Sequence, residues 1–401
     1  MAPYAASMQL ALYAHPFDLQ ALPAAGGLAR LRDLGFAEIV MATSYHDGRW
    51  LMPWHPAGRV RFLEDGTVHF RPRADYGLLA PQPSTSVPST GPSPLELLAA
   101  EAKQHGLRVR AWTVFTHNSR LGERHPDQCV QNAFDDRYRY ALCPAQAAVQ
   151  QYIAALVKDL AAHPGVATIE LEALGQMGFK HSSHHDKASF TPSGLLDAAL
   201  SACFCSACTA VMASAGHDVP RLRADVCAFV RANVGEADAM APPKLPAGAA
   251  ELTASALVVP WLAPVLASRA ATAQRLAAIV KKNAGELASA VQVHPHPWFT
   301  GSQLSVTAAA AFPVPVERVL TCYGEGPDAI AKLLAHDGMQ AAAASPKRVC
   351  IWPKAPQFGS DDDLRRLREL CASHGTASLA IYHLGLLPWR TIERVAKMLA
   401  A

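Results

Sequence analysis

Eight short apolar segments, each followed by a helical segment, run through this 401-residue chain and limit the folds that it can adopt. Short apolar runs between helical patterns are typical of strands. We expect strands at residues 9–15, 37–43, 107–115, 166–173, 290–294, 316–323, 348–352 and 378–382. Alternation of strands and helices predicts a parallel sheet. Eight such units, the last ending in a helix that closes the chain, predict an α/β protein of the (β/α)8 TIM-barrel class.

Two excursions interrupt the predicted alternation. Residues 59–71, with Asp65-Gly66 at their centre, predict a β-hairpin after the second strand. A long helical insertion, about residues 190–286, follows the fourth strand. The Pro- and Ser-rich stretch 81–94 is interpreted as a loop, because strands and helices resume directly after it. We therefore predict a single barrel domain over residues 1–401.

The stretch 167–175, which overlaps the fourth predicted strand, carries the clearest chemical signal. Its residues alternate between two rows, with Ile169, Leu171 and Ala173 in one and Thr168, Glu170 and Glu172 in the other. Two carboxylates against an ordinary apolar core would be costly, but they suit a strand face that looks into a barrel near its open end. We predict that Glu172 is a catalytic acid/base. Burial and the nearby charge of Glu170 are expected to raise its pKa.

Polar and aromatic residues stand at the end of every predicted strand. In a barrel these ends surround one mouth, where active sites lie. Aromatic rings with a few hydrogen-bonding side chains suit a sugar, so we predict a small carbohydrate substrate. The residues predicted to bind it are His15, Tyr45, His46, His117, Asn118, His294, His296, Tyr323, Trp352, Lys354, Tyr382 and His383.

Hydrolysis of a glycoside normally needs two carboxyl groups. Glu325, in the Tyr-Gly-Glu-Gly that follows the sixth strand, is our first choice as partner of Glu172, and Glu170 is included in the catalytic set. Asp135 and Asp136 come next, followed by Asp47. The sequence leaves the retaining and inverting courses open.

A six-residue stretch inside the predicted insertion contains three cysteines, Cys203, Cys205 and Cys208. This spacing is typical of a zinc site, which needs a fourth ligand. Cys143, followed by Pro144, is the first candidate and Cys129 is the second. Four thiolates leave no open position on the metal, so we predict a structural zinc ion.

Residues 137–208 resemble the bacterial β-galactosidases of glycoside hydrolase family forty-two. The shared features, in the same order, are the Cys143-Pro144 pair, Glu172 at the end of the fourth strand, and the three clustered cysteines. The resemblance implies a (β/α)8 barrel, zinc on the cysteines and an acid/base role for Glu172. Leu171 stands where that family has Asn, and the seventh strand ends at Trp352 without a carboxylate. The resemblance therefore supplies no nucleophile, galactose specificity or trimer.

Composition narrows the remaining classes. The formal net charge is +3 and no basic stripe is visible, which argues against a nucleic-acid partner. The apolar stretch 254–267 is interrupted by Pro260 and Pro264, so no membrane span is expected. The N-terminus lacks a secretion-signal pattern, and the cysteine usage suits a reducing compartment. We expect a cytoplasmic protein, and the sequence leaves homo-oligomerisation open.

Two alternative functions stay open at this point. A metal-dependent barrel hydrolase or isomerase would use His294 and His296 with other strand-end histidines. A non-catalytic carbohydrate-binding barrel is the other alternative, because the seventh strand lacks a terminal carboxylate.

Overall fold

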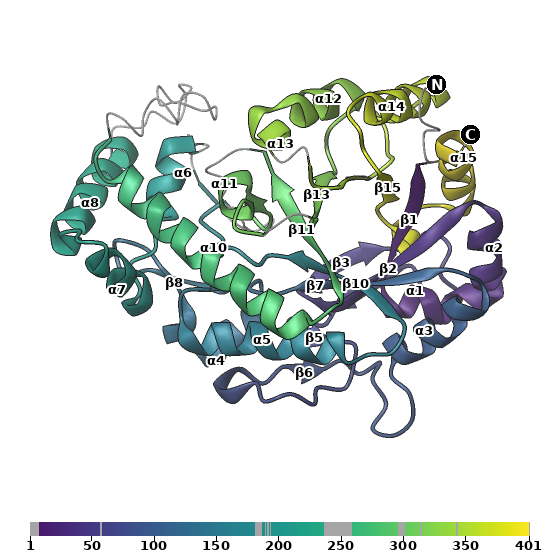
Figure 1. The fold of residues 1–401 in the computed structure, drawn as a ribbon, viewed down its shortest axis with the longest axis horizontal. Coiled ribbons are helices and arrows are strands. Elements are labelled where there is room, and N and C mark those ends of the chain that lie inside the picture. The colour runs from purple at the N-terminus through teal and green to yellow at the C-terminus, as the bar shows by residue number, and fades with distance from the viewer. Residues whose placement is uncertain are drawn as a thin grey trace.

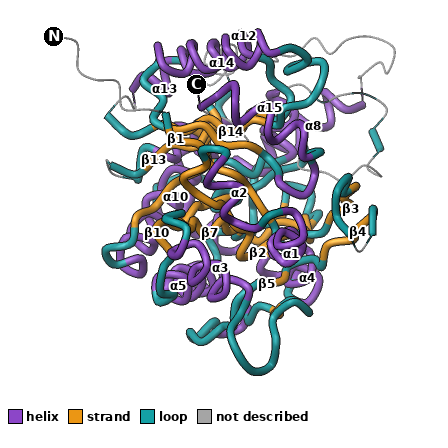
Figure 2. The backbone as a smooth tube through the Cα atoms, turned by 90° about the vertical axis from the view of Figure 1, so that its right-hand side faces the viewer, coloured by secondary structure: helices purple, strands orange, loops and turns teal. Residues whose placement is uncertain are grey.

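The computed structural model describes residues 8–56, 58–180, 187–188, 190, 192, 194–235, 259–295, 301–312, 315–341 and 344–400. In this part of the chain, eight parallel strands close into a barrel surrounded by helices (Figures 1 and 2). The barrel closes because β1 pairs with both β2 and β15, which confirms the predicted fold class. The barrel strands are β1 (Gln9–Ala14), β2 (Phe36–Tyr45), β7 (Arg108–Val114), β10 (Val166–Glu172), β11 (Ala288–His294), β13 (Glu317–Cys322), β14 (Lys347–Ile351) and β15 (Ser378–Ile381).

The outer helices begin where the sequence supplies capping residues. Ser93 accepts a hydrogen bond from the backbone N–H of Glu96, and Ser360 accepts one from that of Asp363, so two helices begin with side-chain caps. None of the described helices is both long enough and apolar enough to cross a membrane. Outside the insertion the α-helices are α1 (Pro16–Ala21), α2 (Gly27–Asp33), α3 (Pro94–Gln104), α4 (Ser119–Arg124), α5 (Ala147–Ala161), α11 (Val306–Ala309), α12 (Pro327–Ala335), α13 (Asp337–Ala341), α14 (Asp361–Ser373) and α15 (Trp389–Ala400).

The segment between β10 and β11 is helical where the structure describes it. Figure 1 shows α6, α7 and α8 grouped to one side of the barrel, with the long α10 returning towards it alongside α5. The helices of this insertion are α6 (Gly194–Leu200), α7 (Ser206–Ser214), α8 (Val219–Gly235) and α10 (Leu262–Ala284).

The excursion after β2 is antiparallel as expected, but its pairing differs from the prediction. β3 (Gly48–Leu51) pairs with β4 (Val60–Leu63), whereas β5 (Thr67–Val68) pairs with the end of β2. Asp65-Gly66 therefore joins two sheets and does not turn one hairpin. The carboxylate of Asp65 accepts hydrogen bonds from the backbone N–H groups of Asp47 and Arg120, which hold the connection in place.

Four further short strands complete the described part. An unpredicted antiparallel pair, β8 (Cys129–Gln131) and β9 (Arg137–Leu142), lies between β7 and α5. β6 (Gln82–Pro83) pairs with β5, and β12 (Leu304–Ser305) pairs with the end of β11.

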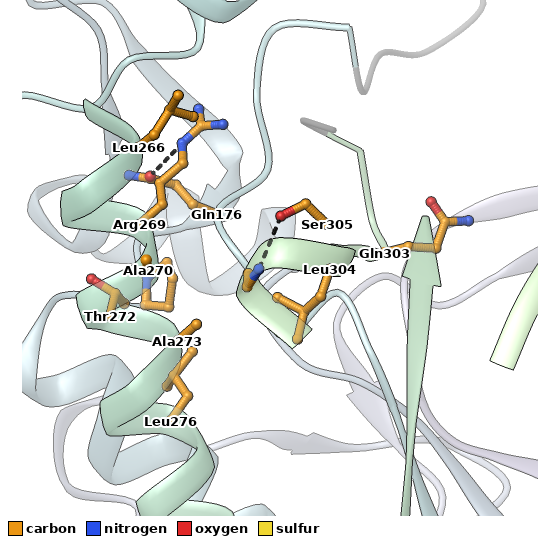
Figure 3. Close-up of a pocket in the computed structure, with 13 residues that line it drawn as sticks. Gln176, Leu266, Arg269, Ala270, Thr272, Ala273, Leu276, Gln303, Leu304 and Ser305 are labelled. Carbon is orange, nitrogen blue, oxygen red and sulfur yellow. Dashed lines mark hydrogen bonds between the residues drawn. The ribbon is translucent and has the colours of Figure 1, made fainter. Parts of the chain in front are cut away.

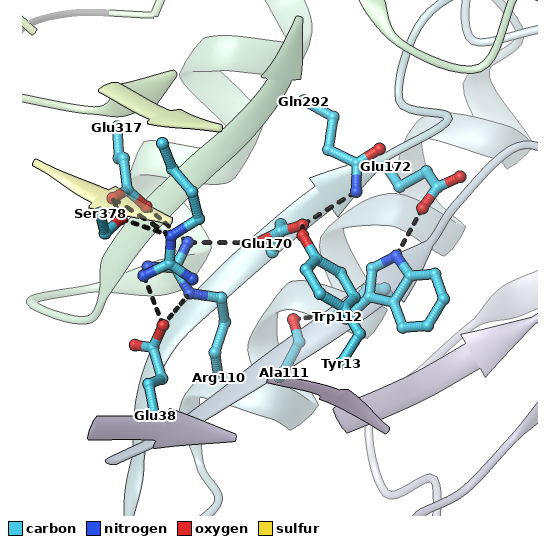
Figure 4. A network of polar contacts seen from close by, with 12 residues as sticks. Tyr13, Glu38, Arg110, Ala111, Trp112, Glu170, Glu172, Gln292, Glu317 and Ser378 are labelled. Carbon is cyan, nitrogen blue, oxygen red and sulfur yellow. Dashed lines mark hydrogen bonds and ion pairs between the residues drawn. The ribbon is translucent and has the colours of Figure 1, made fainter. Parts of the chain in front are cut away.

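The interior of the barrel holds a buried ionic layer near the start of the strands (Figure 4). Arg110 contacts Glu38 at 3.1 Å, Glu317 at 2.6 Å and Glu170 at 3.2 Å. Arg348 contacts Glu38 at 2.6 Å from the next side of the layer. Burial by itself would lower the pKa of Arg110, but the surrounding carboxylates outweigh burial and raise it.

Replacing Arg110 with methionine is expected to lower the free energy of unfolding by about 3–5 kcal/mol, because the buried Glu38 and Glu170 and the partly exposed Glu317 would lose their common partner. Arg108→Met is the matched control. Arg108 lies two residues earlier on β7 and contacts Glu38 at 3.7 Å, with 45% of its side chain exposed, so its loss is expected to cost about 0–1 kcal/mol. Urea unfolding of both variants measures the difference, and equal losses would contradict this account.

Candidate active site and metal centre

Glu172 is the last residue of β10 and lies partly exposed at the carboxyl end of the barrel strands. The indole N–H of Trp112, on the neighbouring β7, donates a hydrogen bond to its carboxylate (Figure 4). Burial raises the pKa of Glu172 to about 7, and the charge of Glu170 adds to the rise while the Trp112 hydrogen bond opposes it. At neutral pH this carboxyl group is therefore present in both protonated and ionised forms.

Glu170 lies one layer deeper than Glu172 and is fully buried. Its Oε1 accepts hydrogen bonds from the hydroxyl of Tyr13 and from Gln292, the latter at 2.8 Å. Its Oε2 faces Arg110. Both carboxylate oxygens therefore already have partners inside the barrel. The charge of Glu170 also acts on Glu172. A direct catalytic role for Glu170 stays a prediction.

Four of the predicted sugar-binding residues form an aromatic group around Tyr382. The hydroxyls of Tyr45 and Tyr382 lie 3.1 Å apart, and the ring of Tyr323 lies 4.5 Å from that of Tyr382. Trp352 meets Tyr382 at 5.9 Å and carries the ammonium of Lys354 3.5 Å above its ring. Burial is the main cause that raises the pKa of Tyr45, Tyr323 and Tyr382, and the charge of Glu172 adds to the rise in each. The three phenols therefore lie near Glu172 in their neutral form.

His46 and His117 extend this aromatic group across the ends of β2 and β7. The ring of His46 stacks between Tyr45 at 4.3 Å and His117 at 4.2 Å. Its Nδ1 lies 2.6 Å from the backbone carbonyl of Asp47. Burial lowers the pKa of His46, so we expect a neutral ring at pH 7.

His15 and His383 lie deeper, among buried aromatic side chains. His15 stacks on Phe17 at 4.3 Å, and Trp50 meets His383 at 4.7 Å. Nδ1 of His383 is 3.5 Å from the carboxylate of Asp18. Burial lowers the pKa of His383 to about 3 and holds that of His15 well below its ordinary value. Both rings are neutral at pH 7, and their contact with a substrate stays a prediction.

Asn118 has a structural function in this fold. Its Oδ1 accepts the backbone N–H of Leu121 at 2.9 Å and so caps α4, while its Nδ2 faces the carbonyl of Gly66 at 3.5 Å. Asn118 is 1% exposed, and the sugar contact predicted for it stays a prediction. His294 ends β11 in register with Ser305, and His296 lies outside the described residues.

The candidates for the second carboxylate lie in different surroundings. Glu325, in the loop after β13, is partly exposed and accepts a hydrogen bond from the backbone N–H of Gly324 at 3.0 Å. Asp135 is exposed and pairs with Arg223 at 2.5 Å, and Asp136 accepts a hydrogen bond from Asn132 inside the β8–β9 turn. Asp135 thus links the turn to α8 of the insertion, and Asp136 stabilises the turn itself.

Four cysteines from two segments form a buried cluster. Cys143 precedes α5, Cys203 and Cys205 precede α7, and Cys208 lies in its first turn. Their sulfur atoms all lie within 4.8 Å of one another, and Sγ of Cys143 is 3.5, 3.9 and 3.5 Å from those of Cys208, Cys203 and Cys205. A zinc–sulfur bond of about 2.3 Å in a tetrahedron places sulfurs about 3.8 Å apart, so the residues fit a tetrahedral metal ion. Cys129 donates instead to the carbonyl of Gly122 at 3.6 Å, which settles the fourth position of the cluster in favour of Cys143.

Hydrogen-bond donors surround the cysteine cluster. The backbone N–H of Gln131 points at Sγ of Cys203 at 3.4 Å, and the amide of Gln176 points at Sγ of Cys208 at 3.5 Å. Nε of Arg269, on α10, donates to Oε1 of Gln176 at 3.1 Å (Figure 3). Gln176 and Arg269 also line a small cleft of about 50 Å³ between α10 and the β12–α11 segment. Donors of this kind stabilise thiolates that bind a metal.

Tyr13, Arg110 and Trp112 are not among the residues that the sequence singles out. Charged residues near the start of four otherwise apolar strands, at Glu38, Arg110, Glu317 and Arg348, are the signal that could have revealed the ionic layer. The hydrogen bonds of Tyr13 and Trp112 to the two glutamates depend on the register of neighbouring strands, which no local pattern shows.

Comparison with known proteins supports the fold at low sequence identity. No protein-family model matches the sequence, and a search of curated proteins gives no match. Among solved structures, the catalytic domain of β-amylase from Paenibacillus polymyxa is similar with a TM-score of 0.54 and 11% identity, covering 97% of each chain. The PgaB (BpsB) glycoside hydrolase domain from Bordetella bronchiseptica gives a TM-score of 0.54 with 13% identity, covering 98% of each chain. A β-galactosidase from Marinomonas ef1 gives 0.52 with 11% identity, and the match spans 98% of this chain and 59% of that one. These likenesses establish a barrel of the kind found in glycoside hydrolases.

Proposed function

We propose that this protein is a glycoside hydrolase that cleaves a small glycoside or oligosaccharide with Glu172 as its general acid. The observation that carries the proposal is the partly exposed carboxyl of Glu172 at a barrel strand end, with its pKa raised to about 7. A general acid works best when its pKa lies near the working pH. The fold shared with glycoside hydrolases supports the same reading.

The proposed reaction begins with a proton transfer. The protonated carboxyl of Glu172 gives its proton to the glycosidic oxygen while the bond from that oxygen to the anomeric carbon breaks, and the aglycone leaves as an alcohol. The anomeric carbon gains a hydroxyl from water, either directly or after a covalent bond to the second carboxylate. The indole of Trp112 fixes the direction of the carboxyl group. The aromatic group around Tyr382, which Trp352 contacts at 5.9 Å, is the proposed platform for the sugar. Glu325 is the proposed second carboxylate.

We further propose that zinc binds Cys143, Cys203, Cys205 and Cys208. The sulfur–sulfur distances of 3.5–3.9 Å support a tetrahedral ion, and thiolate donors favour zinc. Four protein ligands leave no position for substrate, so this metal would hold the fold together and take no part in bond cleavage. This assignment favours the glycosidase over a barrel enzyme whose catalytic metal is bound by strand-end histidines.

The pH dependence of kcat/KM tests the role of Glu172. Because the acid must be protonated to act, kcat/KM is expected to fall about tenfold per pH unit above a pKa of about 7. An ordinary glutamate would begin this fall above about pH 4.3. The measurement uses a panel of phenyl glycosides between pH 4 and 9. A plateau that extends unchanged to pH 9, or a fall that begins near pH 5, would contradict the assignment.

A further inference from the structure

The segment that follows Glu172 is fixed on one side by β7. The backbone N–H of Phe115 donates to the carbonyl of Glu172 at 3.0 Å, and that of Thr116 donates to the carbonyl of Ala173 at 2.8 Å. The hydroxyl of Thr116 also donates to the carbonyls of Ala173 and Gly175, the latter at 3.1 Å. Ala173 has a φ of 49°, in the left-handed region that a non-glycine residue rarely adopts. The backbone after the proposed acid therefore turns sharply and depends on its neighbours to hold that turn.

The other side of the same segment is fixed by the cysteine cluster. Gln176, four residues after Glu172, places its amide nitrogen 3.5 Å from Sγ of Cys208 and 3.9 Å from that of Cys143. Arg269 orients this amide, since its Nε donates to Oε1 of Gln176 at 3.1 Å while its NH2 donates to the carbonyl of Ser201 at 2.8 Å. Figure 3 shows Arg269 and Gln176 facing each other beside the cleft. A single side chain thus connects the strand end that carries Glu172 to the cysteine cluster and to α10.

We propose that Gln176 is a positioning residue, through which the metal-binding cysteine cluster fixes the position of Glu172. The inference rests on the proposed function. Thiolates that bind a metal keep a negative charge and accept hydrogen bonds from the Gln176 amide, so an intact cluster holds residues 172–176 against β7. When the amide is removed, the turn at Ala173 loses its support from the side of the insertion. Glu172 then moves away from Trp112 towards water.

The test is made on the full-length, zinc-loaded protein with Gln176→Leu. The first measurement is the rate of zinc release to a chromophoric chelator, which is expected to rise about tenfold, because outer hydrogen bonds change metal affinity by about 10–100-fold. The second is the pH titration of the Trp112 indole N–H signal by NMR. This signal reports the ionisation of Glu172 because the indole donates to that carboxylate, and the midpoint is expected to move from about 7 towards lower pH as burial is lost. Glu172→Gln identifies the titrating group by removing the transition.

Gln303→Leu is the matched control, because Gln303 lines the same cleft but its amide donates to Thr321. It is expected to keep both the wild-type rate of zinc release and the wild-type midpoint. Arg269→Met is a second variant that leaves Gln176 in place but unoriented, and it is expected to change both readouts in the same direction as Gln176→Leu.

Faster zinc release with an unchanged Trp112 midpoint would overturn the proposal, because Gln176 would then serve the metal alone. Unchanged values of both readouts would overturn it as well. Neither measurement needs turnover. If no glycoside is cleaved but both readouts change, the coupling stands and the proposed hydrolysis fails.

Discussion

Replacing Glu172 with glutamine is expected to lower kcat about 10²–10⁴-fold, the usual contribution of a general acid. Glutamine has nearly the same shape as glutamate, and its carbonyl oxygen can still accept the hydrogen bond from Trp112. The change therefore removes the proton and keeps the geometry, so KM is expected to stay within about threefold.

The stability of this variant separates lost catalysis from lost folding. Since the fold raises the pKa of Glu172 from 4.5 to about 7, the ionised form is disfavoured in the folded protein. The resulting loss in the free energy of unfolding is absent below about pH 4.5, grows as the pH rises, and reaches about 3 kcal/mol above pH 7. Glu172→Gln, which cannot ionise, is expected to be at least as stable as the wild type at pH 8. A variant that is inactive and also less stable at that pH would not support the acid role.

The leaving group of the substrate gives a second criterion. A dinitrophenyl glycoside releases a stable anion and needs little protonation, whereas a methyl or phenyl glycoside depends on the acid. The rate loss in Glu172→Gln is therefore expected to be large for phenyl glycosides and small for dinitrophenyl glycosides. Equal losses for both would contradict the acid role. Glu286→Gln, at an exposed position between α10 and β11, is the matched control and should keep full activity. A protein that binds sugar and cleaves none of these substrates would be a carbohydrate-binding barrel.

The barrel could be predicted because its signal is local and repeated. Each strand is a short apolar run followed by a helical segment, and two of the helices begin at a capping serine, Ser93 and Ser360. The cysteine cluster was predictable for a similar reason, since three ligands lie within six residues. The apolar strands and the three clustered cysteines depend on short-range spacing, which the sequence records directly. The choice of Cys143 over Cys129 depends instead on how α5 is placed relative to α7, which the structure supplies.

The distribution of roles among the polar residues could not be predicted in this way. Glu170 and Glu172 have the same alternation and nearly the same neighbours in sequence, yet one contacts Arg110 and the other contacts Trp112. The difference arises from the pairing of β10 with β7, which sets Glu170 opposite Trp112 and Glu172 opposite Val114. Asn118 shows the same limit, because a strand-end amide that can bind a sugar can equally cap the next helix. Where function depends on such long-range pairing, the structure is needed.

Removing the metal is expected to loosen the insertion while the barrel stays folded. The cluster joins the start of α5 to the segment around α7, and the contacts that Cys143 makes with the other three sulfurs at 3.5–3.9 Å cannot replace the bonds to a metal ion. Zinc bound by thiolates in small domains contributes about 10–16 kcal/mol to their folding, so its loss should free the segment that contains Cys203, Cys205 and Cys208. The apolar layer between the barrel strands and the outer helices does not include the four cysteines, and the closed sheet does not depend on them. The apolar cluster inside the barrel does continue to the cysteines.

Hydrogen exchange on Cys205→Ser measures this expectation. Amides of α6, α7 and the β8–β9 pair should lose most of their protection, whereas those of β1, β14 and β15 should exchange at wild-type rates. Elemental analysis should find about one zinc ion per chain in the wild type and less than about one tenth of that in Cys205→Ser, because a three-thiolate site binds far more weakly. Cys129→Ser is the matched control, since its side chain can still donate to Gly122 and lies outside the cluster; it should keep both zinc and protection. Two outcomes would show that the four cysteines pack as ordinary buried side chains. One is wild-type protein that contains no zinc although zinc was supplied in the medium. The other is a Cys205→Ser variant whose insertion is as well protected as that of the wild type.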